Sequence, residues 1–435
     1  MPDSARGRAR KLQALMRHPV ALSISSVGGA AAFSQIAAIV AAPILARLYP
    51  ADAFGQFGAM LAFANILAPI LLLGLSDAIL SAQDDEVALS LLGAGLRLLL
   101  LLLLPAMGLT LIAIYLRWFG LGVLPVYSVA LIVPLLAMLV LVSLLQALMG
   151  RQLRYGGLAR AYIALGWVRA GAQLLGGWVG ANFAGLAGGE VFGRLCANMV
   201  MVRGLGGQVR SAWRTSSSDR WAALGKYRKF PLTRTPSTLI SAIAVGSPVL
   251  MIATLHGPAT AGQFSMMLTL LLGPVAILQR AVGDVFIGHF GQHYRNDRPR
   301  AWRMALKFGA ALALLGLAFA FVLWFTSEWL FAVFLGSSWT EAGAMAALCG
   351  PWMAAMVLVI PLSQIINVTH RPELKLLFDL AFALALGSLF WWAQRHAMTP
   401  LAFVTWLSLL STGCYLLFLP LLAHAFRKPG PLLRP

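Results

Sequence analysis

Apolar residues dominate the chain in long stretches that alternate with short polar segments. A helix of roughly 20 apolar residues crosses a hydrocarbon core about 30 Å thick, and each stretch is about that long. The pattern therefore predicts about twelve transmembrane helices. Their ranges are 20–46, 54–80, 88–116, 124–148, 158–180, 183–203, 235–255, 260–288, 304–326, 340–366, 374–393 and 400–426.

Basic residues are divided very unequally between the two sides of these spans. Of the 33 Lys and Arg residues, three (Arg47, Arg117 and Arg395) lie on one side and 26 lie on the other, in loops or within the last few residues of a span. The remaining four, Arg97, Arg169, Arg194 and Arg280, lie deeper inside spans. Basic loops are retained in the cytoplasm. The division therefore predicts that both termini are cytoplasmic.

The longest polar break, over residues 203–234, is basic and has six predicted spans on either side. We therefore expect three units. They are an N-terminal six-helix lobe (residues 1–203), a cytoplasmic basic linker (204–234) and a C-terminal six-helix lobe (235–435).

A short internal repeat supports this division. Residues 54–61 (FGQFGAML) recur as residues 261–268 (AGQFSMML), and both copies open an even-numbered span. Six spans separate the copies, so both halves insert in the same direction. Parallel repeats are a transporter architecture with the substrate path between the halves. The expected fold is all-α and polytopic, with two parallel-repeat lobes and a central cleft.

The composition argues against a soluble enzyme. Hydrophobic residues make up 60% of the chain and charged residues 11%. In soluble domains the charged share is about 25%. The net charge of +19 lies in loops between spans, which indicates membrane topology rather than nucleic-acid binding.

The sequence shows no pattern for a bound metal, a disulfide framework or a nucleotide. The three cysteines lack a paired spacing, His289 and His293 lack further ligands, and no glycine loop precedes a lysine. Such patterns are the usual signals for these groups. We expect no cofactor, metal or catalytic residue.

Two charged pairs inside spans have helical spacing. Arg194 follows Glu190 by four residues, and Asp284 follows Arg280 by four, so each pair shares one helix face. Each pair has two interpretations. It is either an intrahelical ion pair that neutralises itself, or part of a cationic cavity for a pyrophosphate, since guanidinium groups match phosphate geometry.

Arg169 is the strongest candidate for substrate binding, because its own span contains no acidic residue. The alternative is a partner from another helix. Arg97 lies near the cytoplasmic end of its span and is expected to reach the headgroups. Arg47, at the external mouth, contacts either a substrate phosphate or the loop that follows it.

Four acids are candidates for coupling transport to Na⁺ or H⁺: Glu190, Asp284, Asp77 and Asp379. An ion-coupled mechanism needs a titratable or cation-binding acid in the cavity. Asp77 lies near the cytoplasmic end of its span, so an interfacial capping role is its alternative. The sequence does not choose among the four.

Several motifs, taken in order, resemble one known group of transporters. Residues 47–50 (RLYP) and 54–57 are similar to the first external loop of polysaccharide transporters of the multidrug/oligosaccharidyl-lipid/polysaccharide exporter superfamily, and residues 83–86 (QDDE) to their acidic cytoplasmic turn. Three positions depart from the family pattern. The family commonly has an arginine at the position of Leu75, and polar, uncharged residues at the positions of Arg280 and Asp284. The resemblance continues to about residue 376 through Phe230-Pro231, Gly257-Pro258, Val285-Phe286, Phe334-Leu335-Gly336, Trp339, Pro351-Trp352, Pro361-Leu362-Ser363 and Asn367-Val368.

The resemblance implies a flippase of the bacterial inner membrane. Its lobes would open alternately to cytoplasm and periplasm and move an oligosaccharide on a polyprenyl-pyrophosphate carrier, as in O-antigen, lipopolysaccharide or exopolysaccharide biosynthesis. The partners are then this lipid-linked oligosaccharide, membrane lipids and a coupling Na⁺ or H⁺, with no nucleic acid.

Two alternatives come from other functional classes. An exporter of small cationic drugs would need acids rather than arginines in its cavity. A membrane-embedded glycan polymerase or ligase would need a large external loop with catalytic pairs. The longest external break here, residues 327–340, holds Glu328 as an acid and no catalytic pairing.

Overall fold

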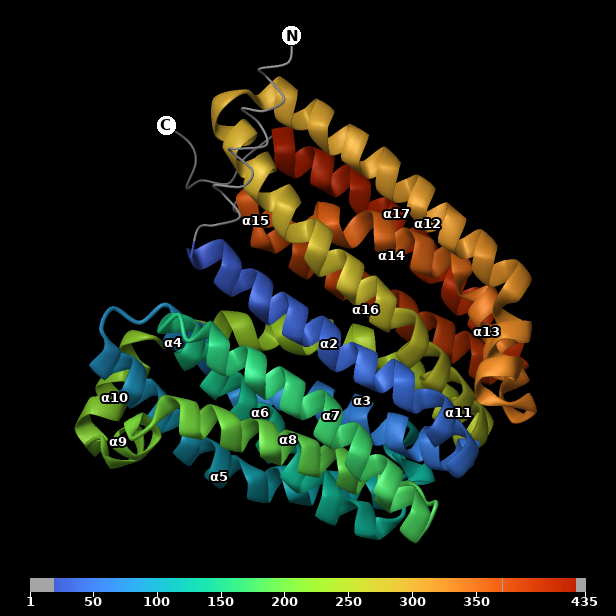
Figure 1. Ribbon diagram of the computed structural model, residues 1–435, viewed down its shortest axis with the longest axis horizontal. Coiled ribbons are helices and arrows are strands. Elements are labelled where there is room, and N and C mark those ends of the chain that lie inside the picture. Colours follow the sequence, from blue (N-terminus) through green and yellow to red (C-terminus); the bar gives the residue numbers. More distant parts are fainter. Residues whose placement is uncertain (1–18, 370, 428–435) are drawn as a thin grey trace.

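The computed structural model describes residues 19–369 and 371–427, without the side chains of residues 19–26, 278–282, 284, 285, 287–289 and 372. Within these ranges all regular structure is helical. The long helices lie side by side along one common direction (Figure 1). The expected all-α, polytopic fold is confirmed.

The first half of the chain contains six long helical stretches. They agree with the first six predicted spans to within about five residues. The helices are α2 (Pro19–Leu48), α3 (Ala51–Leu72) with its continuation α4 (Leu75–Leu80), α5 (Asp85–Tyr115), η1 (Trp118–Val123), η2 (Val126–Ser128), α6 (Val129–Arg151), α7 (Tyr155–Val179) and α8 (Phe183–Leu205).

Two short helices lie in the predicted linker, and the second half of the chain follows. The linker helices are α9 (Gln208–Arg214) and α10 (Ser217–Lys226). The second half contains α11 (Lys229–Asn296), α12 (Arg298–Leu335), η3 (Ser337–Trp339), α13 (Thr340–Leu348), α14 (Gly350–Ser363), α15 (Ile365–Val368), α16 (Pro372–Arg395) and α17 (Pro400–Arg427).

The helix α11 contains two predicted spans that fold back on each other at Gly257. The backbone φ of Gly257 is 83°, a conformation that glycine adopts without steric cost. Pro258 then opens the second segment, because a first-turn residue needs no backbone N–H partner. Both segments pack against α3, with Gly246 of the first near Ile66 and Ser265 of the second near Gly58.

Nine stretches within the described residues are long and apolar enough to cross a membrane. The helices α7 and α8 are not among them, because glycines and charged residues lower their hydropathy. The folded-back α11 counts once. The structure is therefore consistent with the twelve predicted spans.

The two ends of the molecule differ. Figure 1 shows the first-half helices close to α13 near the α2–α3 turn, whereas α15 lies well apart from α4 and α10. We call the end with α13 and the α2–α3 turn the motif end, because it carries both copies of the repeat, and the end with α4, α10 and α15 the linker end. The first segment of α11 remains beside α3 and α4 at the linker end, where Arg234 Nε lies 3.3 Å from Asp77 Oδ2. The other helices of the second half diverge from the first half toward the linker end (Figure 1).

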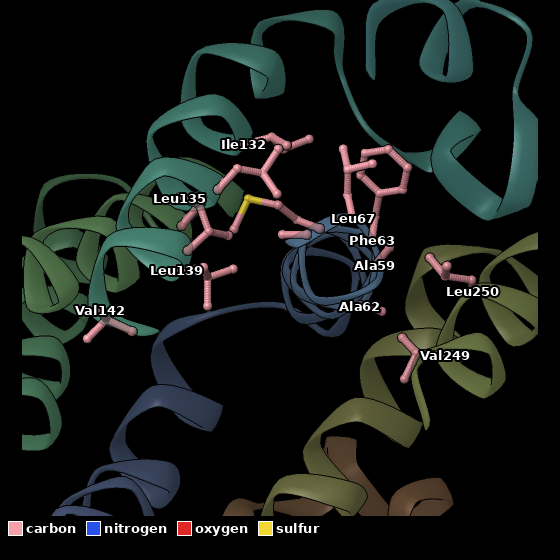
Figure 2. Close-up of a cluster of buried hydrophobic side chains, with 14 of the residues drawn as sticks. Ala59, Ala62, Phe63, Leu67, Ile132, Leu135, Leu139, Val142, Val249 and Leu250 are labelled. Carbon is pink, nitrogen blue, oxygen red and sulfur yellow. The ribbon is translucent and has the colours of Figure 1, made fainter. Parts of the chain in front are cut away.

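The helix α3 packs between α6 and the first segment of α11. Figure 2 shows α3 end-on, with Ile132 and Leu135 of α6 on one side and Val249 and Leu250 of α11 on the other. All four side chains are buried, as is Phe63 of α3. The second predicted span is thus a central packing element that contacts both halves of the chain.

Candidate functional site

Three charged side chains meet between α7 and α8. Glu190 is 1% exposed, and its Oε1 accepts a hydrogen bond from Arg194 Nε, one turn later on α8, at 2.6 Å. Arg169 Nη1, from α7, lies 3.5 Å from Glu190 Oε2. Two guanidinium groups therefore share one carboxylate, which leaves one surplus positive charge. We call these three residues the arginine cluster.

Glycines bring α7 and α8 close enough to form this cluster. A Cβ atom built on Gly193 would lie 2.6 Å from the Cβ of Arg169, and one on Gly189 would lie 2.5 Å from the Cγ of Gln173. The buried Gln173 donates from Nε2 to the carbonyl of Leu186. Small residues let helices approach closely in membranes. The glycines that lower the hydropathy of these spans therefore allow them to pair.

The two arginines of the cluster are held differently. Arg194 is fixed by its short hydrogen bond and its side chain is 16% exposed, whereas Arg169 makes the longer contact and is 24% exposed. Among the described residues, Glu190 Oε2 accepts no hydrogen bond. Arg169 is therefore the arginine that a competing phosphate would draw away first.

The structure describes the side chains of three of the four arginines predicted inside spans. The Glu190–Arg194 ion pair forms, which is one of the two interpretations of the spacing. Arg169 has a partner from another helix, which was its alternative. Arg280 and Asp284 belong to α11, but their side chains lie outside the described residues.

Arg97 contacts α9, the first of the two linker helices. Its Nη2 donates to the carbonyl of Trp213, and its guanidinium lies 4.9 Å from the centre of that ring.

The other candidate acids within the described side chains are ion-paired. Asp77 Oδ2, on α4, lies 3.3 Å from Arg234 Nε at the start of α11. Asp379 Oδ2, on α16, lies 2.6 Å from Lys375 Nζ, one turn earlier. The spacing of Lys375 and Asp379 was a signal that sequence reasoning missed. Arg234 gave no such signal, because only the folded chain brings it to Asp77.

At the motif end, Tyr49 rather than Arg47 is the anchored residue. Arg47 is exposed in the last turn of α2 and has no ion pair in the described part of the chain. Tyr49 is 2% exposed and donates its hydroxyl to the carbonyl of Gln173 at 2.7 Å. Burial raises the pKa of Tyr49, so this hydroxyl remains a donor. The loop is therefore tied to α7, one turn from Arg169.

The two copies of the repeat pack against each other. A Cβ atom on Gly55 of α3 would lie 1.8 Å from the carbonyl oxygen of Pro258, and one on Gly262 of α11 would lie 1.9 Å from the carbonyl oxygen of Ala51. Only glycine fits at either position. Sequence reasoning identified the repeat but missed this contact, although a glycine at the same place in both copies was the available signal.

The glutamines beside these glycines make matching contacts. Gln56 Nε2 donates to the carbonyl of Val123 in η1 at 3.0 Å, and Gln263 Nε2 donates to the carbonyl of Ser338 in η3 at 2.7 Å. The turn η1 follows α5 and η3 follows α12, which are the third and ninth predicted spans. The two copies therefore occupy equivalent positions in the two halves.

Trp339 extends the contact between the halves. Its Nε1 donates to the carbonyl of Ala46 in α2 at 2.9 Å, and its ring lies edge-on to Phe54 of α3 with centroids 5.3 Å apart. Trp339 is 1% exposed. The halves are thus joined at the motif end by glycine, hydrogen-bond and aromatic contacts.

Two cavities stand out among the described residues. One, of about 480 Å³, lies between the start of α5 and the linker helices, with Glu86, Ser90, Asp219 and Lys226 in its wall. The other, of about 220 Å³, lies between α6 and α8. Neither is lined by a residue of the second half, so the central cleft expected from the sequence stays a prediction.

The chain resembles known proteins both in sequence and in fold. The family described as "Polysaccharide biosynthesis protein" matches residues 44–344. The inward closed conformation of the lipid II flippase MurJ has a TM-score of 0.72 at 11% identity, over 92% of this chain and 89% of that chain. No curated protein matches the sequence.

Two further solved structures are similar over almost the whole chain. An inward-facing multidrug resistance MATE family transporter of the MOP superfamily has a TM-score of 0.65 at 14% identity, over 93% of this chain and 96% of that chain. A MOP superfamily transporter from Pyrococcus furiosus, described by the reverse polarity of its binding pocket, has a TM-score of 0.55 at 16% identity, over 95% and 98%. The chain is a multi-pass membrane protein with the fold of these transporters.

Proposed function

Because the chain belongs to the polysaccharide biosynthesis protein family, we propose that it is a flippase for a polyprenyl-pyrophosphate-linked oligosaccharide. The substrate moves from the cytoplasmic to the periplasmic leaflet of a bacterial inner membrane. The lobes over residues 1–203 and 235–435 rock about the motif end, and residues 204–234 join them on the cytoplasmic side, where both termini lie.

The observation that carries the proposal is the surplus positive charge of the arginine cluster inside membrane-spanning helices. An unneutralised charge in the hydrocarbon core is costly, and such charges mark substrate paths. A guanidinium group keeps its charge and donates two parallel hydrogen bonds to a phosphate. A cationic drug would be repelled by this cluster. The charge therefore favours the flippase over the drug exporter.

The helix arrangement supports entry of the substrate from the linker end. The halves are joined at the motif end, and the second-half helices other than the first segment of α11 diverge from the first half toward the linker end (Figure 1). The basic loops lie at the linker end, which the distribution of Lys and Arg makes cytoplasmic. Net transport requires the two states to bind the substrate differently, so a gradient or consumption of the product must bias the cycle.

Coupling to Na⁺ or H⁺ through one of Glu190, Asp284, Asp77 and Asp379 is part of the proposal. Glu190, Asp77 and Asp379 each lie within 3.5 Å of a basic nitrogen. A coupling cation would have to displace that basic group or bind beside it against charge repulsion.

Translocation by purified protein in vesicles tests the proposed function. We expect the wild type to expose a labelled polyprenyl-pyrophosphate oligosaccharide to an impermeant reagent on the opposite side. We expect Arg169→Ala to slow this by about 10- to 100-fold, the effect of losing a hydrogen bond to a charged group. Arg169→Lys should be intermediate, because ammonium binds phosphate as a point charge.

Arg160→Ala is the matched control, because it removes an exposed arginine from the same helix. Wild-type rates in well-inserted Arg169→Ala protein would remove Arg169 from the mechanism. Transport of a cationic drug in place of the lipid-linked oligosaccharide would instead favour the exporter.

A further inference from the structure

A groove runs along the outer side of the first half, between α6 and α8. It has a volume of about 220 Å³ and is almost entirely apolar until it reaches an arginine at the linker end. Met199 in its wall is 48% exposed, so the groove is open at the protein surface. The lining residues are Leu141, Leu195, Asn198, Met199, Val202 and Arg203.

The groove has a fixed inner wall and a length suited to a lipid chain. Asn198 is 2% exposed and donates from Nδ2 to the carbonyl of Met138 at 3.2 Å, which joins α8 to α6. Eight residues of helix separate Leu195 from Arg203, which is about 12 Å. This is most of the roughly 15 Å depth of hydrocarbon in one leaflet.

One guanidinium group lines the linker end of the groove, and a second is held near it. Arg203 is exposed, and among the described residues it has no ion pair. Arg154 Nη1 donates to the carbonyl of Gly204 at 2.6 Å, which holds a second cation beside it. Basic side chains at the membrane surface attract anionic headgroups. An apolar channel with a cationic end is complementary to a lipid that carries a phosphate.

We propose that this groove binds an anionic phospholipid of the leaflet that meets the linker end. One acyl chain lies along Leu195 and Met199, and the phosphate contacts Arg203 and Arg154. The headgroup provides the selectivity, because a lipid tail that moves from the bilayer to an apolar groove gains little free energy.

The occupant is a resident lipid rather than the transported one. The groove is walled by α6 and α8 and includes no residue of the second half, so it does not lie on a path between the halves. This inference does not depend on the proposed flippase activity.

Lipid binding to the purified protein tests the proposal, with native mass spectrometry as the readout. We expect phosphatidylglycerol to bind more tightly than phosphatidylcholine, and Arg203→Gln to weaken phosphatidylglycerol binding about fivefold, the effect of one basic residue at an anionic surface. Arg210→Gln, which removes an exposed arginine of α9, should leave binding unchanged. Val202→Phe, which places a ring in the groove, should weaken binding.

Equal weakening by Arg203→Gln and Arg210→Gln would overturn the proposal, as would equal affinity for the two phospholipids. Full binding by folded Val202→Phe would show that the chain does not occupy the groove. If polyprenyl phosphate displaces phosphatidylglycerol at a lower concentration than phosphatidylglycerol itself requires, the assignment to a resident phospholipid is wrong. The Arg203→Gln comparison remains decisive if Val202→Phe does not fold.

Discussion

A single methyl group at Gly262 is expected to abolish transport and destabilise the protein. Its carbon would lie 1.9 Å from the carbonyl oxygen of Ala51 and 3.0 Å from the backbone nitrogen of Gly55. Both are backbone atoms that cannot rotate away, so α3 and α11 must separate. Overpacking of this kind costs about 1–3 kcal/mol or more. Thermal unfolding of purified Gly262→Ala, together with vesicle transport, measures the effect.

The direction of the stability change distinguishes this steric effect from the higher helix propensity of alanine. Gly108 of α5 has no neighbour within 4 Å of a built Cβ atom. Gly108→Ala should therefore stabilise the helix by about 0.5–1 kcal/mol. Gly55→Ala should act like Gly262→Ala, and the double variant should cost less than the sum, because one separation relieves both clashes. A Gly262→Ala protein that melts like Gly108→Ala would show that the crossing is not tight.

The second large effect is expected at Glu190. Glu190→Gln keeps the side-chain volume but leaves Arg169 and Arg194 as two unpaired cations between α7 and α8. Removal of one partner from a buried ion pair costs about 3–5 kcal/mol, because the remaining charge loses its compensation. We expect poor insertion or a much lower unfolding temperature, measured on protein extracted from the membrane.

A second substitution provides the control for Glu190→Gln. The wild-type arginine cluster has a net charge of +1, Glu190→Gln raises it to +2, and Glu190→Gln with Arg194→Gln returns it to +1. We therefore expect the double variant to recover most of the lost stability. Equal stability of Glu190→Gln and wild type would show that this carboxylate does not hold the two helices together.

The helices could be predicted from the sequence because burial in a membrane leaves a strong and local signal. Continuous apolar stretches predicted the spans and their approximate number, and the unequal distribution of basic residues predicted their orientation. The prediction was least direct for α7 and α8, where residues such as Gly189 and Gly193 lower hydropathy and at the same time let the helices pair. One sequence feature thus weakens the membrane signal and creates the packing.

The candidate site could be predicted only where its contacts are local. The Glu190–Arg194 pair follows from four-residue spacing on one helix. The contacts of Arg169 with Glu190 and of Asp77 with Arg234 join different helices, and no periodicity in a single sequence encodes them. The glycine crossing is an intermediate case, because the repeat was visible but its self-contact depends on how the halves pack.

Binding of a polyprenyl pyrophosphate to the purified protein decides whether the arginine cluster receives the substrate. Arg169 is the arginine least firmly held by Glu190, so Arg169→Ala should weaken the affinity about 10- to 100-fold while Arg160→Ala leaves it unchanged. Equal affinities of wild type and folded Arg169→Ala would place the diphosphate elsewhere and contradict the proposed site.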